Sequence, residues 1–352
     1  MVNASAPAGR YVVNYTAMQR VEGHRASAAG TPRPVRLLAA GGTISMRGEH
    51  AVPAVDGAQL IAELPELASG PPLQAETVLA LPGAHLTLSD SLRLAHRARD
   101  AADAGEGVVI TTGTDTMEEL AVLCALVHDG EAPIVLTGAN RPGSQPGADG
   151  PANLLDAVAV AGAPQAAGLG AVIVFGGEIH GAMTARKVDS TSPTAFGSPT
   201  AGPLGRVVER RVWLHAMPIR PAALDLGRLA NRVVVVTAGL GDDGAMLRHA
   251  SRSADGVVLV ALGAGHLPLG VMEELEAAAD RVPVVITCRP ERSSMMFSTY
   301  GFAGAERDLR ASGAICAPFL SPAAARVILL CCLGAGLDRA GARAALAPWD
   351  AA

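Results

Sequence analysis

Two short polar turns carry the residues best suited to chemistry. The turn TGTD at 112–115 directly follows an apolar run, and the turn GGT at 41–43 follows the run VRLLA. A threonine hydroxyl becomes a useful nucleophile only when a nearby base accepts its proton. A glycine pair allows close approach of the backbone and leaves N–H groups that hold a developing oxyanion. Together the two turns indicate nucleophilic chemistry that uses hydroxyl groups.

The chain offers one residue that could act as the base. Lys187 is the only lysine among its 28 basic residues, and all the others are arginines. Arginine keeps its proton in proteins, whereas lysine can be tuned to give it up. With Thr43, Thr114 and Asp115, Lys187 makes a set of two hydroxyls, a carboxylate and a base that needs no histidine. Considered alone, Lys187 could equally well be an inert surface lysine.

Structural explanations also exist for the turn residues. Asp115 with Glu118, and Thr116 with Glu119, both fit the capping box that begins a helix. Thr43 fits an ordinary turn hydroxyl. Taken singly, these residues favour a structural role, and only their combination favours catalysis.

The segments around the turns fit a parallel α/β sheet. Continuous β-branched runs are typical of strands buried on both faces, and they lie at 35–39, 108–111, 133–137 and 171–175. Segments of helical length alternate with them at 90–104, 116–128 and 151–161. This alternation predicts a parallel sheet, in which ligands bind at the carboxyl ends of the strands. Both polar turns follow such ends.

A second α/β series begins after a proline-containing stretch. Strands are expected at 233–237, 257–261 and 284–287, and helices at 243–251, 271–278 and 322–333. We therefore expect a domain at 34–213, a linker at 214–231 and a second domain at 232–352. Residues 1–33, rich in Ala, Gly and Arg, are expected to form a flexible N-terminal extension.

Composition narrows the partners and the compartment. The formal net charge of −5 argues against nucleic acid or an anionic lipid surface as a partner. The five cysteines lack metal-type spacing, and the histidines His85, His180 and His266 fit no metal site. No apolar run is long enough for a membrane span, and the first residues lack the apolar core of a secretory signal. We expect a cytoplasmic protein without metal or cofactor.

Five motifs, in their order and spacing, resemble the bacterial-type L-asparaginases, a family of asparaginase and glutaminase amidohydrolases. They are AAGGTIS at 39–45, TTGTDTMEELA at 111–121, TGANRP at 137–142, ADGPANLLDAV at 148–158 and ARKVDSTSPTAF at 185–196. A matching YGF lies at 300–302. The resemblance implies a larger N-terminal parallel-sheet α/β domain, a smaller flavodoxin-like C-terminal α/β domain, and a homodimer or homotetramer with shared active sites.

The resemblance also implies roles for single residues. It makes Thr43 the nucleophile, Thr114 the second threonine and Lys187 its partner, and it makes Asp115 the residue that holds the substrate's α-amino group. Gly42 and Gly113 belong to the same motifs and are expected to contact substrate. Ala139 would offer its carbonyl oxygen to the leaving amide nitrogen, and His266 would contact ligand from the partner subunit.

Three departures from the family concern activation of the nucleophile and binding of the substrate. The loop at 46–55 lacks the tyrosine that family members carry there, with Glu49 or His50 as stand-ins. Gly83 and Ala84 occupy the positions of a serine and a polar residue that bind the substrate's α-carboxylate and amino group. The carboxylate normally supplied by the neighbouring subunit has Glu291 as its nearest candidate.

The expected activity is hydrolysis of L-asparagine to L-aspartate and ammonia. One alternative is the same mechanism on another amide, namely glutamine or a blocked or peptidyl asparagine, because a vacated contact can make room for a larger group. The other alternative is a ligand-binding homologue without turnover.

Overall fold

The computed structural model describes residues 30–48, 50 and 52–350. Residues Pro32–Ala352 belong to one compact unit, and the description below concerns its described residues. Most of the expected N-terminal extension, residues 1–29, lies outside the described residues.

The N-terminal domain is built on an eight-stranded sheet with the strand order β12-β11-β8-β7-β6-β5-β1-β4. Five neighbouring strands of this sheet, β7, β6, β5, β1 and β4, run parallel to one another. Their bounds are β1 Val35–Gly41, β4 Leu73–Leu81, β5 Gly107–Thr111, β6 Ile134–Thr137 and β7 Ala171–Phe175. Every residue of β5, β6 and β7 is buried, as continuous apolar runs predict for strands covered on both faces.

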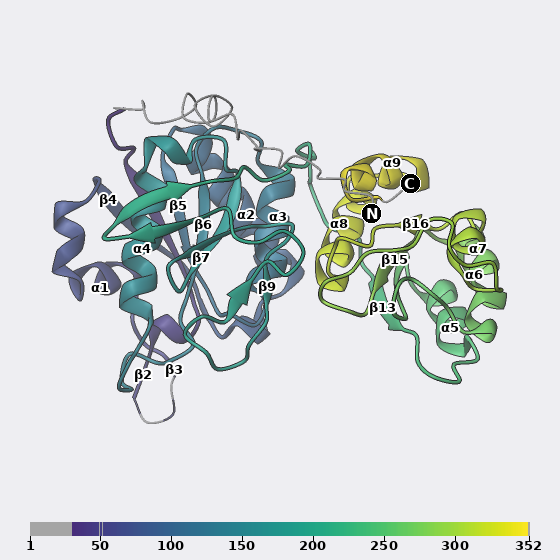
Figure 1. Ribbon diagram of the computed structural model, residues 1–352. Helices are drawn as coiled ribbons and strands as arrows, with labels where there is room; N and C mark the ends of the chain where they lie inside the picture. The colour runs from purple at the N-terminus through teal and green to yellow at the C-terminus, as the bar shows by residue number, and fades with distance from the viewer. Residues whose placement is uncertain (1–29, 49, 51, 351–352) are drawn as a thin grey trace, which may run out of the picture. The chain divides into compact units, whose positions relative to one another are not determined.

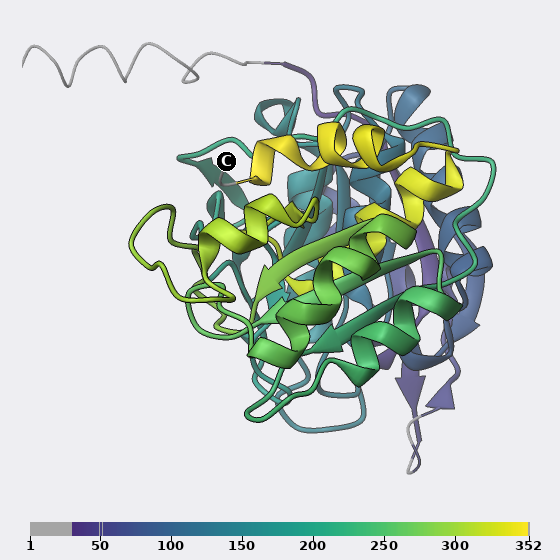
Figure 2. The ribbon, with the colours of Figure 1, turned by 90° about the vertical axis from the view of Figure 1, so that its right-hand side faces the viewer.

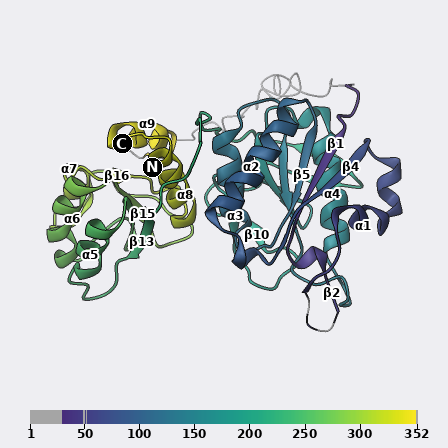
Figure 3. The same cartoon turned by 180° about the vertical axis from the view of Figure 1, so that it is seen from behind.

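Two pairs of helices cover the two faces of this sheet (Figures 1 and 3). Their bounds are α1 Gly57–Ala62, α2 Leu88–Asp103, α3 Met117–Val127 and α4 Gly150–Gly162. Helices α2 and α3 pack on one face around Leu94 and Leu126, with Ile110 from the sheet. Helices α1 and α4 pack on the other face around Leu60 and Leu154.

The sheet is not wholly parallel, which the sequence did not predict. Strands β7, β8, β11 and β12 pair antiparallel to one another, with bounds β8 Glu178–Gly181, β11 Gly205–Val208 and β12 Arg211–Leu214. Two small antiparallel pairs are separate from this sheet, β2 Met46–Arg47 with β3 Val52–Pro53 and β9 Arg186–Lys187 with β10 Phe196–Gly197. These strands are too short for a periodic pattern to reveal them.

The C-terminal domain has a four-stranded parallel sheet in the order β13-β14-β15-β16. Its strands are β13 Val233–Thr237, β14 Gly256–Ala261, β15 Val284–Cys288 and β16 Ile315–Cys316. Its helices are α5 Ala245–Ser253, α6 Leu269–Arg281, α7 Glu306–Ala311, α8 Pro322–Gly334 and α9 Arg339–Leu346. Helices α5 and α6 lie over one face of the sheet in Figure 2, where Leu247 and Leu275 join its core. The expected two-domain α/β architecture is confirmed.

Helix α8 packs on the other face of that sheet and also against α3. The Arg326 guanidinium donates to the Val233 carbonyl at 3.0 Å and forms a 3.1 Å ion pair with Glu119 on α3. Helix α3 begins directly after the turn at 112–115, so α8 also supports that turn. Residues 215–232 contain no helix or strand, and β12 extends through Leu214.

Candidate active site

The two polar turns meet at the carboxyl ends of three neighbouring strands. β1 lies between β4 and β5 in the sheet, and all three are parallel. The turn with Thr43 follows β1, the turn with Thr114 follows β5, and Gly83 follows β4. The chain goes from β1 outward to β4 and then returns across β1 to β5. Such a switch in strand order is where open α/β sheets bind ligands.

Three glycines allow these loops to touch backbone to backbone. A Cβ atom built on Gly42 would come within 2.3 Å of the Gly113 nitrogen, and Gly42 has a positive φ of 78°. A Cβ built on Gly113 would come within 2.5 Å of the Gly83 nitrogen. Any side chain at Gly42 or Gly113 would push the loops apart, because both contacts are with backbone atoms. The glycines therefore fix the distance between the Thr43 and Thr114 turns.

Lys187 and Thr114 form the polar centre of the site. Lys187 Nζ lies 2.8 Å from Thr114 Oγ1 and 3.2 Å from Asp115 Oδ1. Thr114 is 5% exposed, whereas the side chains of Lys187 and Asp115 are 20% and 63% exposed. The structure thus brings a hydroxyl, an amine and a carboxylate of the expected set into direct contact, with the carboxylate on the solvent side.

Short strands and a buried carboxylate position Lys187. Lys187 pairs with Phe196 across β9 and β10, and the Phe196 ring lies 5.1 Å from that of Phe175 in the core. The Lys187 backbone N–H donates to Glu118 Oε2 at 2.6 Å. Burial raises the pKa of the Glu118 carboxyl, and the Lys187 N–H that donates to it opposes this rise. Glu118 therefore fixes the backbone from which the amine extends.

An asparagine that the sequence analysis did not select holds Thr114 from the other side. Thr114 Oγ1 donates to Asn140 Oδ1 at 3.1 Å, and Asn140 Nδ2 donates to the Ser192 carbonyl oxygen at 2.6 Å. Asn140 lies in the TGANRP segment that follows β6. Its position in this motif could have marked Asn140 as a candidate site residue. Only the fold places it against Thr114, which lies 26 positions away in the sequence.

The capping-box interpretation of the turn is wrong for the side chains concerned. Helix α3 has Thr116 as its N-cap residue, but no side chain caps it. Thr116 Oγ1 donates to the Gly83 carbonyl oxygen at 3.0 Å instead. Glu118 binds the Lys187 N–H and Glu119 binds Arg326. These polar groups connect the turn to other elements rather than starting the helix.

Thr43 begins a short 3-10 helix, η2 Thr43–Ser45. Among the described residues, none forms a hydrogen bond with its hydroxyl. Ser45 Oγ closes the turn by donating to the Gly42 carbonyl at 2.9 Å. Ala139 is buried, and Gly150 packs against both Ala139 and Ile44: a Cβ on Gly150 would meet Ile44 at 2.9 Å and Ala139 at 3.4 Å. Thr43 is thus half-buried and available at the meeting point of the loops.

Gly83 and Ala84 lie in the 3-10 helix η4 Gly83–His85. A Cβ atom at Gly83 would approach the Gly113 backbone at 3.0 to 3.2 Å, so its absence leaves no empty space at that point. The Ala84 side chain is exposed. Among the described residues, none accepts a hydrogen bond from the Gly83 N–H.

His266 lies in the C-terminal domain, and the side chains that it contacts belong to the same domain. Its ring packs edge-on against Tyr300 and Phe302, with centroids 4.9 and 5.0 Å away, and Nε2 lies 3.9 Å from Glu306 Oε2. The structure does not bring His266 against Thr43 or Thr114 of the same chain. The exposed Glu291 lies close enough to influence Arg186, the neighbour of Lys187, whose pKa burial lowers and the charges of Glu118 and Glu291 raise.

Of the two residues that could replace the loop tyrosine, His50 and Glu49, the structure describes His50. The strands β2 and β3 close the loop as a hairpin, and His50 at its tip is exposed. Glu49 lies outside the described residues. Within residues 30–48, 50 and 52–350, no group of three or more His, Cys, Asp or Glu side chains is arranged to hold a metal ion.

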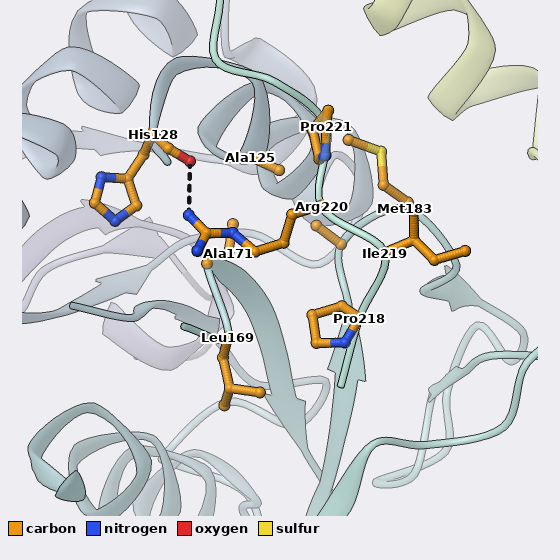
Figure 4. Close-up of a pocket in the computed structure, with 11 residues that line it drawn as sticks. Ala125, His128, Leu169, Ala171, Met183, Pro218, Ile219, Arg220 and Pro221 are labelled. Carbon is orange, nitrogen blue, oxygen red and sulfur yellow. Dashed lines mark hydrogen bonds between the residues drawn. The ribbon is translucent and has the colours of Figure 1, made fainter. Parts of the chain in front are cut away.

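A hollow far from the turns is not a second substrate site. It lies at the amino end of β7, opposite the strand ends that carry the turns, and Figure 4 shows Arg220 extending through it toward the His128 carbonyl oxygen. Arg220 Nη2 lies 3.0 Å from the Gly130 oxygen and 3.5 Å from that of His128. The remaining volume is about 10 Å³, which is room for one water molecule at most.

Comparison with known proteins agrees with this geometry. The family model described as "Asparaginase, N-terminal" matches residues 34–220, and "Glutaminase/Asparaginase C-terminal domain" matches residues 232–346. A probable L-asparaginase of Deinococcus radiodurans is 37% identical over 88% of this chain and 96% of its own length. A glutaminase-asparaginase of Pseudomonas aeruginosa is 33% identical over 69% of this chain and 71% of its own.

A solved structure, the probable cytoplasmic L-asparaginase from Campylobacter jejuni, superposes with a TM-score of 0.78 at 27% identity. The superposition covers 90% of this chain and 99% of the other. The fold and the matched domains define a two-domain α/β amidohydrolase. The chain belongs to the asparaginase family, which confirms the resemblance seen in its motifs. No helix in the described part of the chain is long and apolar enough to cross a membrane.

Proposed function

We propose that this protein hydrolyses the side-chain amide of L-asparagine to L-aspartate and ammonia. The contact of Lys187 Nζ with Thr114 Oγ1 at 2.8 Å, beside the turn that carries Thr43, is the observation on which this proposal depends. Membership of the asparaginase family and the printed names of the relatives support it.

In the proposed reaction, Lys187 accepts a proton through Thr114 from the attacking hydroxyl, which belongs to Thr43 or to a water molecule. The oxygen adds to the amide carbon, and the tetrahedral intermediate collapses with loss of ammonia, which takes up the proton. If Thr43 attacks, water then hydrolyses the resulting ester to release aspartate. The Thr43 hydroxyl, which has no hydrogen-bond partner among the described residues, suits the role of the attacking group. The Thr114 hydroxyl, which contacts Lys187, suits the role of the proton relay.

Backbone groups are proposed to stabilise the charges of the reaction. In the described chain the N–H groups of Thr114 and Asp115 donate to no other backbone or side-chain group, and they directly follow Gly113, whose backbone lies against Gly42 of the Thr43 turn. Free N–H groups of this kind stabilise an oxyanion in a site shielded from water. We assign the carbonyl of Ala139 to the leaving amide nitrogen and the loop glycines Gly42 and Gly113 to close approach of the substrate.

Substrate holding is assigned to Asp115 and to the turn after β4. The Asp115 carboxylate is exposed and already contacts the Lys187 side-chain nitrogen at 3.2 Å, so an α-amino group can bind on its free side. The unpaired N–H of Gly83 suits the α-carboxylate. Since a Cβ at Gly83 would be crowded by Gly113, the glycine does not by itself create space for a blocked substrate.

We further propose a cytoplasmic homodimer or homotetramer in which His266 reaches the site of a partner subunit. The Campylobacter neighbour is named as cytoplasmic, and the intrachain contacts of His266 leave it away from Thr114. The expected domain limits of 34–213 and 232–352, joined by 214–231, remain part of this proposal.

Ammonia release tests the function directly. The purified chain would be assayed with L-asparagine, L-glutamine, D-asparagine and N-acylated or peptidyl asparagines, beside Thr43→Ala and Lys187→Met. We expect turnover of L-asparagine that both substitutions abolish. Turnover of glutamine alone or of a blocked amide alone would replace the substrate but keep the chemistry. Specific binding of asparagine without turnover of any amide would instead establish a binding protein.

A further inference from the structure

Asn140 fixes the direction in which the Thr114 hydroxyl points. An asparagine amide can place either its oxygen or its nitrogen toward a neighbour, and the surrounding hydrogen bonds decide between them. Here one end of the Asn140 amide lies 2.6 Å from the Ser192 carbonyl oxygen, which can only accept. The nitrogen must therefore face Ser192, and the oxygen must face Thr114 at 3.1 Å.

This orientation determines the direction of both hydrogen bonds made by the Thr114 hydroxyl. Asn140 Oδ1 cannot donate, so the single hydroxyl proton of Thr114 must point toward it. Thr114 Oγ1 then has only lone pairs left for Lys187 Nζ, 2.8 Å away, and the amine must be the donor. The hydrogen bonds run from Lys187 to Thr114 to Asn140, which is opposite to the direction needed when Lys187 takes up a proton.

We infer that Asn140 is a positioning residue that holds Thr114 in its resting direction and so favours the form of the site in which Lys187 carries its proton. For Lys187 to act as a base, the Thr114 hydroxyl must turn from Asn140 toward Nζ. Breaking the bond to Asn140 opposes that turn. The inference rests on the proposed function of Thr114 and Lys187.

The amide of Asn140 is held too firmly to follow the hydroxyl. Its backbone N–H donates to both carboxylate oxygens of Asp149 at 3.0 and 3.1 Å, and the N–H of Arg141 donates to Asp149 at 2.8 Å. Asn153 Nδ2 binds the same carboxylate at 3.2 Å and the Gly138 carbonyl at 3.0 Å. Asp149 and Asn153 are buried, so this network keeps the loop after β6 in one conformation.

Several charged groups face Lys187 and act on the same equilibrium. Asp115 contacts Nζ, and Glu118 accepts the Lys187 backbone N–H. Arg186 precedes Lys187, and its pKa is influenced by the charges of Glu118 and Glu291. These groups remain unchanged when Asn140 alone is replaced. A change seen in the Asn140 variants therefore reports the Asn140 contact.

The test uses two substitutions of similar size with opposite expected effects. Asn140→Leu removes the acceptor, so the Thr114 hydroxyl is free to turn toward Nζ. Asn140→Asp keeps an oxygen that accepts from Thr114 and makes it anionic, which favours the ammonium group, while its second oxygen replaces the amide nitrogen and loses the hydrogen bond to the Ser192 carbonyl oxygen. We expect the acidic limb of the pH profile of kcat/KM to move down by about 0.5 to 1 pH unit in Asn140→Leu, the worth of one hydrogen bond. In Asn140→Asp it should move up.

A second measurement does not depend on turnover. Because Lys187 is the only lysine, protein grown with ¹³Cε-labelled lysine gives one side-chain signal, and its titration midpoint can be followed by NMR in the full chain. Midpoints that move in opposite directions in the two variants would support the inference. Midpoints that stay at the wild-type value, or that both move the same way, would overturn it, even if the variants lose activity.

The outcomes separate this inference from the proposed function. If Lys187→Met keeps wild-type turnover, the proposed chemistry fails whatever Asn140 does. If Lys187→Met is inactive and the Asn140 variants lose kcat without a change in the pH profile, Asn140 is only a structural residue and the inference fails. Should Asn140→Leu not fold, Asn140→Ala removes the same acceptor in a smaller side chain.

Discussion

Lys187 Nζ and Thr114 Oγ1 lie 2.8 Å apart although 73 positions separate the two residues in the sequence. Thr114 stands in the turn between β5 and α3, whereas Lys187 belongs to the short strand β9, which pairs only with β10. The Glu118 carboxylate on α3 bridges the two segments through the Lys187 N–H. The contact therefore depends on the start of α3 as well as on the two residues themselves.

Thr114 and Lys187 are expected to act as one unit. Thr114→Val and Lys187→Met should each lower kcat by about 10²- to 10⁴-fold, the usual contribution of a positioned acid–base group. The kcat of the double variant should lie within a few-fold of the kcat of the less active single variant, because either change already interrupts the proton path. Steady-state ammonia release measures all three. Losses that multiply would show that the two side chains act independently.

Asp115 is expected to serve substrate binding more than the chemical step. Its carboxylate is exposed, and it reaches Lys187 Nζ at 3.2 Å. Asp115→Asn should raise KM for L-asparagine by about 10-fold or more, because the charge-assisted bond to the α-amino group becomes a neutral one. An amide substrate without an α-amino group should lose far less. Equal losses for both substrates would assign Asp115 to the chemistry instead.

Glu118 is expected to act through the position of Lys187. Glu118→Ala removes the acceptor of the Lys187 N–H and should lower kcat by about 10- to 100-fold, because a displacement of about 1 Å at a reacting group has that effect. Glu118→Gln keeps an acceptor oxygen and should retain most of the activity. Thermal unfolding of both variants provides the control. If Gln is as inactive as Ala in folded protein, the negative charge of Glu118 matters rather than its hydrogen bond.

Asp156 on α4 should destabilise the protein above pH 6. Burial raises the pKa of its carboxyl from the ordinary 3.8 to about 6. Between these values the folded state binds a proton that the unfolded chain has lost, so the free energy of unfolding falls as pH rises, and above about pH 6 the penalty is constant.

Asp156→Asn should therefore stabilise the protein at pH 7.5 by on the order of 1 kcal/mol, a figure reduced from the full shift because the carboxyl keeps partial contact with water. Near pH 4 the substitution should have almost no effect. Urea unfolding at the two pH values measures the difference. A gain of equal size at both would assign the effect to packing rather than ionisation.

The sequence by itself determined the strands and helices of both domains where apolar runs were long. The expected strand at 233–237 coincides with β13, and the helices at 90–104 and 151–161 differ from α2 and α4 by one or two residues at each end. Burial on both faces requires a continuous apolar run, which is visible without a structure. The motifs were equally direct, since the order of residues within a turn is local information.

Tertiary structure decided what the polar side chains of those turns contact. Asp115, Thr116, Glu118 and Glu119 fit a capping box in the sequence, but their partners are Lys187, Gly83, the Lys187 backbone and Arg326. A side chain of this length can bond to its own helix or to any element within reach, and only the packed fold selects between them. The same holds for Asn140, whose amide has a defined direction only because Ser192 lies against it.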